Sequence, residues 1–176
     1  SEIYPNIKKI DEFVNKLNAS KRPLLISGRG ARNSGDVIES FLSKTGVLYL
    51  DTQDSRGLIS AQHNSNVYAA RSKVMSEADL VIIVGRKLDY QLAYGSPAIF
   101  SNASFIRISD NPYELVDNRR GEPEIYAEPK LVFQEINCRE LKTNFDKKWI
   151  MEIRNFQNEK IEKFKNNKES YLGDDN

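Results

Sequence analysis

The sequence has little of what enzymatic chemistry or export usually requires. Its 176 residues include one cysteine, Cys138, and one histidine, His63. A single cysteine excludes an internal disulfide and favours a reducing, cytoplasmic setting. One histidine and one cysteine cannot form a zinc site by themselves, so we expect no metal. We expect His63 to be either a solvated residue or one that tethers a polar loop. The sequence contains no G-x-S-x-G, phosphate-loop or paired-carboxylate pattern, so we predict no catalytic residues.

An excess of charge of one sign is also absent. The chain has 26 basic and 25 acidic residues and a net charge of +1 at pH 7, which gives no electrostatic reason to expect nucleic acid or an anionic membrane as a partner. No apolar run approaches the roughly 20 residues that span a bilayer. The first residues, SEIYPNIKK, lack the layout of a signal peptide. The chain also lacks an initiator methionine, which suggests a piece of a longer protein.

Short apolar segments alternate with segments of helical periodicity. The strand-like segments are 23–27, 47–50, 79–85, 104–109 and 124–126, and the helix-like segments are 7–18, 34–46, 67–78, 111–118 and 129–141. The segment DLVIIVG is apolar throughout, as expected of a strand that is covered on both faces. For the helix 34–46, Ser34 is the expected N-cap and Gly46 the expected C-terminal stop. The alternation predicts an α/β fold with a doubly wound parallel sheet and helices on both faces.

The composition changes after about residue 138. Residues 139–176 are mostly charged, yet apolar residues recur at helical spacing or lie beside those positions: Trp149, Ile150, Ile153, Phe156, Ile161 and Phe164. This pattern indicates a long amphipathic helix that packs on the domain or on a neighbour, followed by a polar end. A simple linker is the alternative. We therefore divide the chain into a domain of residues 1–138 and a helix-and-linker segment of residues 139–176.

The first strand is followed by the stretch GRGARN. In open parallel sheets, ligands bind at the carboxyl ends of strands. Gly28 and Gly30 would allow a tight turn and the close approach of a phosphate to backbone N–H groups. The dinucleotide fingerprint requires a third glycine, where this chain has Asn33. The alternative is a strand-to-helix turn that needs glycine only for its backbone angles.

A second candidate contact follows the strand 79–85. Arg86 and Lys87 would emerge at its carboxyl end, where cations suit phosphate oxygens and an arginine can hold them in bidentate fashion. Asp89 could instead hold Arg86 in a purely structural ion pair, so both interpretations stay open.

A third candidate contact follows the strand 104–109. Asp110 and Asn111 lie at its carboxyl end, where a carboxylate could accept hydrogen bonds from ribose hydroxyls. The alternative is that these residues cap the short helix expected to begin at Pro112.

The order of these segments resembles a known family. The stretches RPLLISGRGA, FLSKTGVLYLDT, AARSKVMSEADLVIIVGRKLD, FIRISDNPYEL and PKLVFQEI follow one another across roughly residues 8–137. They resemble the central domain of thiamine-diphosphate-dependent enzymes. The most similar types are the acetolactate synthase large subunits and the branch of oxalyl-CoA decarboxylase and 2-hydroxyacyl-CoA lyase.

The resemblance implies a Rossmann-like (DHS-like nucleotide-binding) fold with about six strands and a non-catalytic role in a three-domain, homo-oligomeric transferase or lyase. Thiamine diphosphate and magnesium would be bound by the neighbouring domains. In this domain, family members hold FAD or ADP, or leave the site empty. RKLDYQ lacks the second acid and second arginine of FAD-binding synthases, which favours ADP or an empty site. The family's nucleotide contacts carry over to Gly28, Arg29, Gly30, Arg86, Leu88, Asp89, Asp110 and Asn111.

Two alternatives remain. A free-standing nucleotide-binding module of sirtuin-like or electron-transfer-flavoprotein-like type would share the sheet architecture, although a sirtuin usually needs four cysteines for its zinc ribbon. The domain could also be a spacer without a ligand, in which Tyr90, Tyr94 and Trp149 would be exposed contacts between domains.

Overall fold

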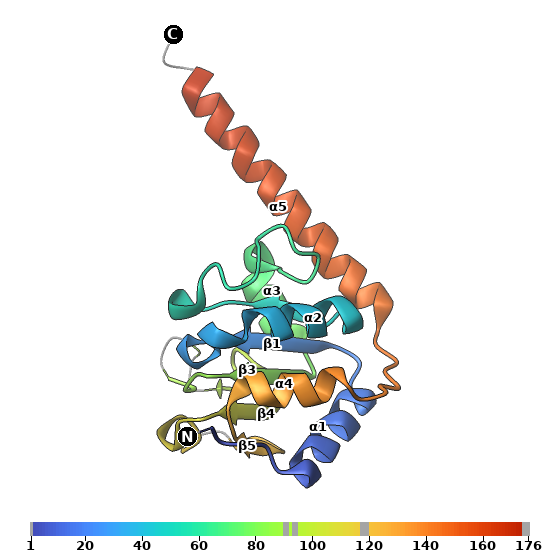
Figure 1. Ribbon diagram of the computed structural model, residues 1–176. Helices are drawn as coiled ribbons and strands as arrows, with labels where there is room; N and C mark the ends of the chain where they lie inside the picture. Colours follow the sequence, from blue (N-terminus) through green and yellow to red (C-terminus); the bar gives the residue numbers. More distant parts are fainter. Residues whose placement is uncertain (1, 90–91, 93–94, 117–119, 174–176) are drawn as a thin grey trace.

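The computed structural model describes residues 2–89, 92, 95–116 and 120–173 (Figure 1). Its helices and strands are α1 (Ile7–Ala19), β1 (Pro23–Ser27), α2 (Gly35–Thr45), β2 (Leu48–Leu50), α3 (Arg71–Glu77), β3 (Leu80–Val84), β4 (Ser104–Ser109), β5 (Glu124–Tyr126), α4 (Pro129–Asn137) and α5 (Lys147–Gly173). Short 3-10 turns are η1 (Arg29–Ser34), η2 (Gln53–Ser55), η3 (Tyr68–Ala70) and η5 (Pro112–Glu114).

The five described strands form one parallel sheet in the order β2-β1-β3-β4-β5. The predicted α/β fold with a parallel sheet is therefore confirmed. The family resemblance implied about six strands, whereas the described residues form five. Each of these five corresponds to one of the five apolar segments in the sequence, so the extra strand had no segment of its own.

The order of the strands explains why helices cover both faces. The chain moves from β1 to β2 through α2, and then returns across β1 to β3 through α3. Right-handed crossovers in opposite directions place α2 and α3 on opposite faces, and the direction changes between β1 and β3. α1 and α4 pack with α2, where the rings of Phe13, Phe41 and Phe133 meet edge to face at centroid distances of 5.2–6.2 Å (Figure 1).

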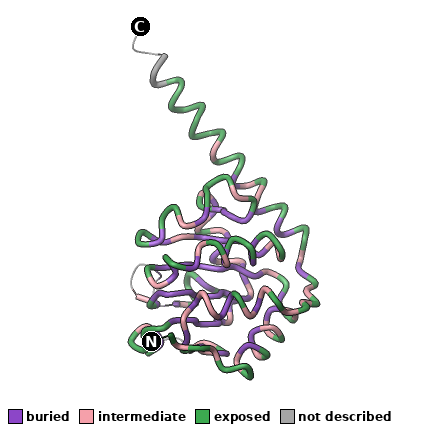
Figure 2. The backbone as a smooth tube through the Cα atoms, viewed as in Figure 1, coloured by how far each residue is buried: buried purple, intermediate pink, exposed green. Residues whose placement is uncertain are grey.

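The central strands are buried along their whole length. Every residue of β1 and β3 is buried (Figure 2). This burial agrees with the unbroken apolar run of the sequence, because a strand covered by helices on both faces has no solvent side. The sheet therefore provides a rigid platform from whose carboxyl edge the loops emerge.

The two predicted ends of α2 have different outcomes. Gly46 ends the helix as expected, with a φ of 78° and its N–H donating to the carbonyl oxygen of Leu42 at 2.8 Å. Ser34 does precede the first helical residue, but its side chain makes no capping hydrogen bond. Its φ of −116° and ψ of 12° continue from η1, whereas a capping side chain needs the extended backbone of a typical N-cap.

The amphipathic helix predicted in the charged segment is confirmed as α5. Its first turns pack on the domain through Trp149, Ile150 and Ile153, and its outer part projects away from the sheet (Figures 1 and 2). Trp149 is 1% exposed, so the expectation that it is an exposed contact was wrong. Tyr90 and Tyr94 lie outside the described residues. The domain boundary at residue 138 stays a prediction. No helix in the described ranges combines the length and apolarity that crossing a membrane requires.

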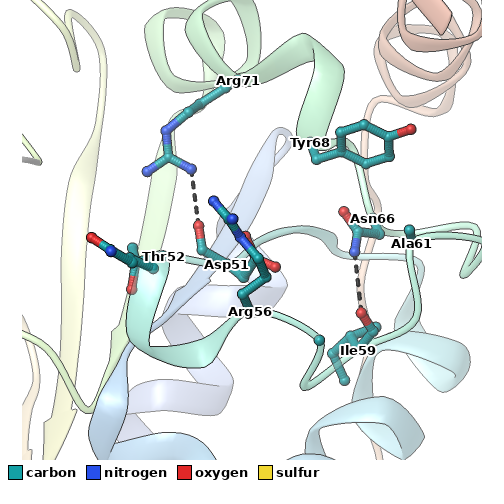
Figure 3. Close-up of a pocket in the computed structure, with 10 residues that line it drawn as sticks. Asp51, Thr52, Arg56, Ile59, Ala61, Asn66, Tyr68 and Arg71 are labelled. Atoms are coloured by element: carbon teal, nitrogen blue, oxygen red, sulfur yellow. Dashed lines mark hydrogen bonds between the residues drawn. The ribbon is translucent and has the colours of Figure 1, made fainter.

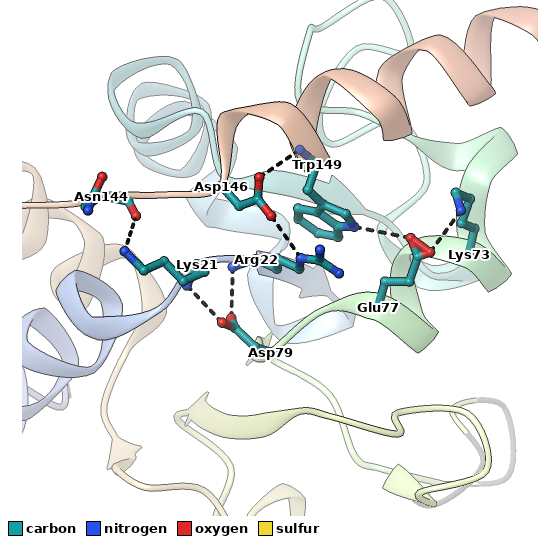
Figure 4. A network of polar contacts seen from close by, with 8 residues as sticks. All are labelled: Lys21, Arg22, Lys73, Glu77, Asp79, Asn144, Asp146 and Trp149. Carbon is teal, nitrogen blue, oxygen red and sulfur yellow. Dashed lines mark hydrogen bonds and ion pairs between the residues drawn. The ribbon is translucent and has the colours of Figure 1, made fainter.

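A polar network holds the start of α5 against the amino-terminal edge of the sheet (Figure 4). The Asp79 carboxylate accepts hydrogen bonds from the backbone N–H groups of Lys21 and Arg22 at 2.9 and 3.0 Å. Arg22 Nε in turn lies 3.2 Å from Asp146 Oδ2. Hydrogen bonding from the Trp149 backbone N–H, together with Arg22, holds the pKa of Asp146 below its usual range. The base of α5 is thus tied to β1 and β3 through charged groups.

Candidate functional site at the carboxyl edge of the sheet

The turns after β1 and β3 contact each other through their backbones. The Gly28 N–H donates to Val84 O at 2.8 Å, and the Gly30 N–H donates to Gly85 O at 3.0 Å. A Cβ at Gly30 would lie 2.8 Å from Gly85 Cα, and a Cβ at Gly85 would lie 2.5 Å from the carbonyl carbon of Gly30. Gly85 also has a φ of 66°. The glycines therefore have a packing reason to be there, because a side chain would collide with the opposite backbone. We call these two segments, Gly28–Gly30 and Gly85, the glycine turns.

The predicted phosphate contacts of the first turn stay predictions. The alternative, a turn that needs glycine for its geometry, agrees with the close packing of Gly28 and Gly30 against Gly85 and Arg86. Arg29 is exposed and begins η1.

Arg86 follows Gly85 and is largely buried. Its side chain is 8% exposed, and its Nη2 lies 3.1 Å from Asp89 Oδ1. The structural ion pair left open by the sequence is therefore present. The side chain of Leu88 is part of the hydrophobic core, so only the backbone of this residue could face a ligand.

Asp110 and Asn111 are exposed beyond β4. Asn111 Oδ1 accepts a hydrogen bond from the Tyr113 N–H at 3.0 Å and caps η5, as the capping alternative predicted. The helix expected over 111–118 is only the short turn η5 in the described residues 111–116, and the positions 117–119 lie outside them. The ribose contact proposed for Asp110 stays a prediction.

A cleft with a volume of about 570 Å³ opens beyond the carboxyl end of β2. It is lined by Asp51, Thr52, Gln53, Arg56, Gly57, Ile59, Ala61, Asn66, Tyr68 and Arg71. We call it the β2 cleft. The eight predicted contact residues are absent from this lining, although they lie along the same edge of the sheet.

Arg71 connects the β2 cleft to the glycine turns. It is the first residue of α3, where the helix dipole disfavours a cation. Its Nη1 donates to Asp51 O at 2.9 Å (Figure 3). Burial lowers the pKa of Arg71, the Asp51 charge opposes this shift, and the charge of Arg86 lowers the pKa further. Arg71 and Arg86 are therefore close enough to repel each other.

Three further side chains give the β2 cleft its chemical character. Tyr68 is 47% exposed, and Arg56 points from the loop toward Asp51 (Figure 3). Asn66 is buried, and its Nδ2 donates to Ile59 O at 3.4 Å, while its Oδ1 has no hydrogen-bond partner. The β2 cleft thus combines cations for an oxyanion, a ring face for stacking and a buried acceptor that still needs a donor.

Buried hydroxyl groups fix the loop that carries the β2 cleft to the end of β1. Ser27 Oγ lies 2.6 Å from Tyr49 Oη and donates to Ser55 Oγ at 2.9 Å. Thr52 Oγ1 donates to Ser27 O at 2.9 Å. Burial raises the pKa of Tyr49 to about 12, so this phenol stays protonated and can serve as a hydrogen-bond donor.

His63 tethers its loop, one of the two roles expected from the sequence. Its Nδ1 accepts a hydrogen bond from the Ser65 N–H at 3.1 Å, so the neutral ring carries its proton on Nε2, which lies 3.0 Å from Ser43 Oγ. A ring that donates to Ser43 cannot act as a base toward it. Over the described ranges, no group of three or more histidine, cysteine, aspartate or glutamate side chains could hold a metal ion.

Sequence reasoning treated residues 51–66 only as a polar loop and so missed the β2 cleft. Two signals could have found it. The loop follows a strand end of the parallel sheet, the usual location of ligands. Arg71 also stands at the start of a helix, where a cation is unfavourable unless something negative is nearby.

The chain is similar to known proteins across most of its length. Residues 10–136 match the family model described as the central domain of thiamine pyrophosphate enzymes. The chain is 31% identical over 144 residues to 2-hydroxyacyl-CoA lyase from Oryza sativa subsp. japonica, a match that covers 78% of this chain and 25% of that protein. It is 29% identical over 119 residues to oxalyl-CoA decarboxylase from Escherichia coli (strain K12), covering 66% and 21%.

The fold is also similar to that of a solved structure, benzoylformate decarboxylase from Polynucleobacter necessarius. The TM-score is 0.65 at 19% identity, and the match covers 82% of this chain and 30% of that chain. The chain spans a quarter or less of the length of the two curated relatives.

Proposed function

Because the chain belongs to the family of thiamine pyrophosphate enzyme central domains, we propose that it is the non-catalytic central domain of a longer enzyme. That enzyme would make or break a carbon–carbon bond next to a carbonyl group, with thiamine diphosphate supplying the carbanion chemistry. The neighbouring domains would bind thiamine diphosphate and magnesium, and the whole protein would be a homo-oligomer. The similarity to a lyase and a decarboxylase supports the CoA branch, and the acetolactate synthase type stays a prediction. The family match argues against a sirtuin-like or electron-transfer-flavoprotein-like module.

Within this domain, the proposed role is to bind a nucleotide diphosphate at the carboxyl edge of the sheet. The carrying observation is that two cations, Arg56 and Arg71, line the cleft at the carboxyl end of β2, and that the charge of Arg86 is near enough to lower the pKa of Arg71. A diphosphate bound in the β2 cleft would gain charge-assisted contacts from these cations and offset their mutual repulsion.

The other features of the edge fit the same ligand. The volume of about 570 Å³ is in the range of small-molecule sites. Tyr68 offers a ring face for a base, and Asn66 Oδ1 offers an acceptor for an amine or hydroxyl donor. ADP is the proposed nucleotide, since the sequence lacks the second acid and second arginine expected for FAD.

The test is calorimetric titration of the purified chain with ADP and AMP. Arg71→Met should weaken ADP binding about tenfold or more through the loss of charge-assisted contacts. Arg120→Met is the matched control, because Arg120 is exposed and pairs with Glu124 outside the β2 cleft. ADP should also bind more tightly than AMP.

Two results would contradict the nucleotide role. The first is no ADP binding at millimolar concentration, and the second is equal ADP affinity in the Arg71 and Arg120 variants. Neither result would affect the assignment to the central-domain family.

A further inference from the structure

The outer wall of the β2 cleft is held by a side chain from far along the sequence. Gln157 of α5 is buried, and its Oε1 accepts a hydrogen bond from the Ala69 N–H at 2.9 Å. Its Nε2 donates to Asn66 O at 2.6 Å. A single amide therefore spans the segment 66–69 with both of its polar atoms.

This segment lies between α5 and the β2 cleft. Asn66 and Tyr68 line the β2 cleft, and they also line a smaller cavity of about 390 Å³ whose other wall is α5. Arg71 follows the segment by two residues. The three residues that the proposed ligand would contact on this side thus depend on the position of one short stretch of backbone.

The start of the segment pairs with β2, because the Tyr49 N–H donates to Ser65 O at 2.7 Å and the Val67 N–H donates to Tyr49 O at 3.1 Å. Beyond Val67, Gln157 supplies the cap. η3 and α3 begin without a side-chain capping hydrogen bond of their own, so Gln157 satisfies an N–H group that a local cap would normally satisfy. The cap comes instead from a residue 88 positions away in sequence. The position of the wall is therefore linked to the docking of α5.

We propose that Gln157 is a positioning residue for the β2 cleft, so that ligand binding in the β2 cleft and docking of α5 stabilise each other. The identity of the ligand in this inference rests on the proposed nucleotide role. The positioning of the segment 66–69 by Gln157 does not. Coupling between two sites is reciprocal. A change that loosens the docking of α5 near Gln157 must therefore lower the affinity for the ligand, and bound ligand must stabilise the docking of α5.

The base of α5 provides an internal reference. Trp149, the only tryptophan of the chain, is held by Arg22, by Asp146 and by Glu77 of α3, none of which belongs to the segment 66–69. Its fluorescence therefore reports the docking of the first turns of α5 independently of Gln157. A variant that changes the wall alone should leave this emission unchanged.

The experiment compares Gln157→Met with Gln134→Met, both in the full chain. Methionine keeps the length and helix propensity of glutamine but removes both hydrogen bonds. Gln134 is exposed on α4 and serves as the matched control. Without ligand, amide hydrogen exchange at residues 66–70 should be faster in Gln157→Met only. With ligand, ADP affinity should fall about 3- to 10-fold, and the ADP-induced protection of α5 around residue 157 should disappear.

The outcomes separate this inference from the proposed function. If exchange at residues 66–70 is unchanged without ligand, Gln157 does not position the wall and the inference is wrong. If exchange rises but ADP affinity and α5 protection match the control, the coupling is absent. If the wild-type chain does not bind ADP, the nucleotide role fails, and the ligand-free exchange result still decides whether Gln157 positions the wall.

Discussion

The glycine turns and the β2 cleft lie along the same sheet edge but are built in opposite ways. At the glycine turns, backbone packs on backbone so closely that a Cβ at Gly85 would lie 2.5 Å from its neighbour. At the β2 cleft, the loop from Asp51 to Tyr68 encloses about 570 Å³. At the glycine turns, which carry a recognisable motif, the space is occupied by the protein backbone. The loop of the β2 cleft carries no such motif, yet it surrounds an open space.

The difference shows that a glycine motif and a ligand cavity need not coincide. Glycine is required wherever two backbones approach closely, whether or not a phosphate follows. A cavity instead needs side chains that converge from distant parts of the chain, as Arg56 and Asn66 of the loop and Arg71 of α3 do. The glycine turns therefore bring β1 and β3 together, while the neighbouring loop supplies the groups that could bind.

The largest expected effect on stability comes from glycine-to-alanine variants, which separate the cost of a steric clash from the cost of a positive φ. Gly85 and Gly57 both have positive φ, 66° and 84°, but a Cβ at Gly57 would meet nothing within 4 Å. Gly85→Ala should lower the free energy of unfolding by roughly 3 kcal/mol or more, and Gly57→Ala by about 1 kcal/mol. Urea denaturation measures both. Equal losses of unfolding free energy in the two variants would mean that the close packing at Gly85 does not contribute to stability.

The next effect concerns the hydroxyl network beneath the β2 cleft. The folded pKa of Tyr49 is about 12, above the unfolded value of about 10, so its stabilising effect is complete below pH 10 and is lost as pH rises toward 12. The loss should reach roughly 2 to 3 kcal/mol by pH 12. Tyr49→Phe should flatten this part of the stability curve. A profile that matches that of the wild type would show that Tyr49 is not the titrating group.

A smaller effect tests whether Asp89 is structural. Asp89→Asn removes one charged partner of the buried Arg86 and should lower stability by about 1 kcal/mol or less, since the Asp89 side chain is partly exposed. ADP binding should be unchanged or slightly tighter, because Asp89 then no longer offsets part of the positive charge of Arg86. Thermal unfolding and calorimetry measure the two quantities. Markedly weaker ADP binding would instead place Asp89 among the ligand contacts.

The smallest expected effect on stability comes from Asp146, at the amino-terminal edge of the sheet. The pKa of Asp146 is lowered by the Trp149 N–H and by Arg22, so the contribution of Asp146 to stability is present above its unfolded pKa of roughly 4. It is lost as pH falls through the lower folded value. Asp146→Asn should reduce the acid dependence of the Trp149 fluorescence transition. An unchanged acid transition would assign that dependence to other carboxylates.

The sheet could be predicted from the sequence because its strands are encoded locally. β3 is apolar at every position and β1 at every position except Ser27, and Gly46 ends α2 through its own backbone conformation. The position of the outer wall of the β2 cleft could not be predicted in this way, because Gln157, which caps the Ala69 N–H, lies 88 residues away. Ser34 shows the same limit at short range, since η1 sets its backbone angles.

The central claim is that the β2 cleft, together with Arg86, holds the ligand, while the glycine turns serve packing. A crystal structure of the chain with ADP tests it most directly. We expect phosphate oxygens within hydrogen-bond distance of the Arg71 and Arg86 guanidinium groups, with the ring of Tyr68 against the base. ADP bound along Gly28–Gly30 and Asp110, without contact to Arg71, would contradict it.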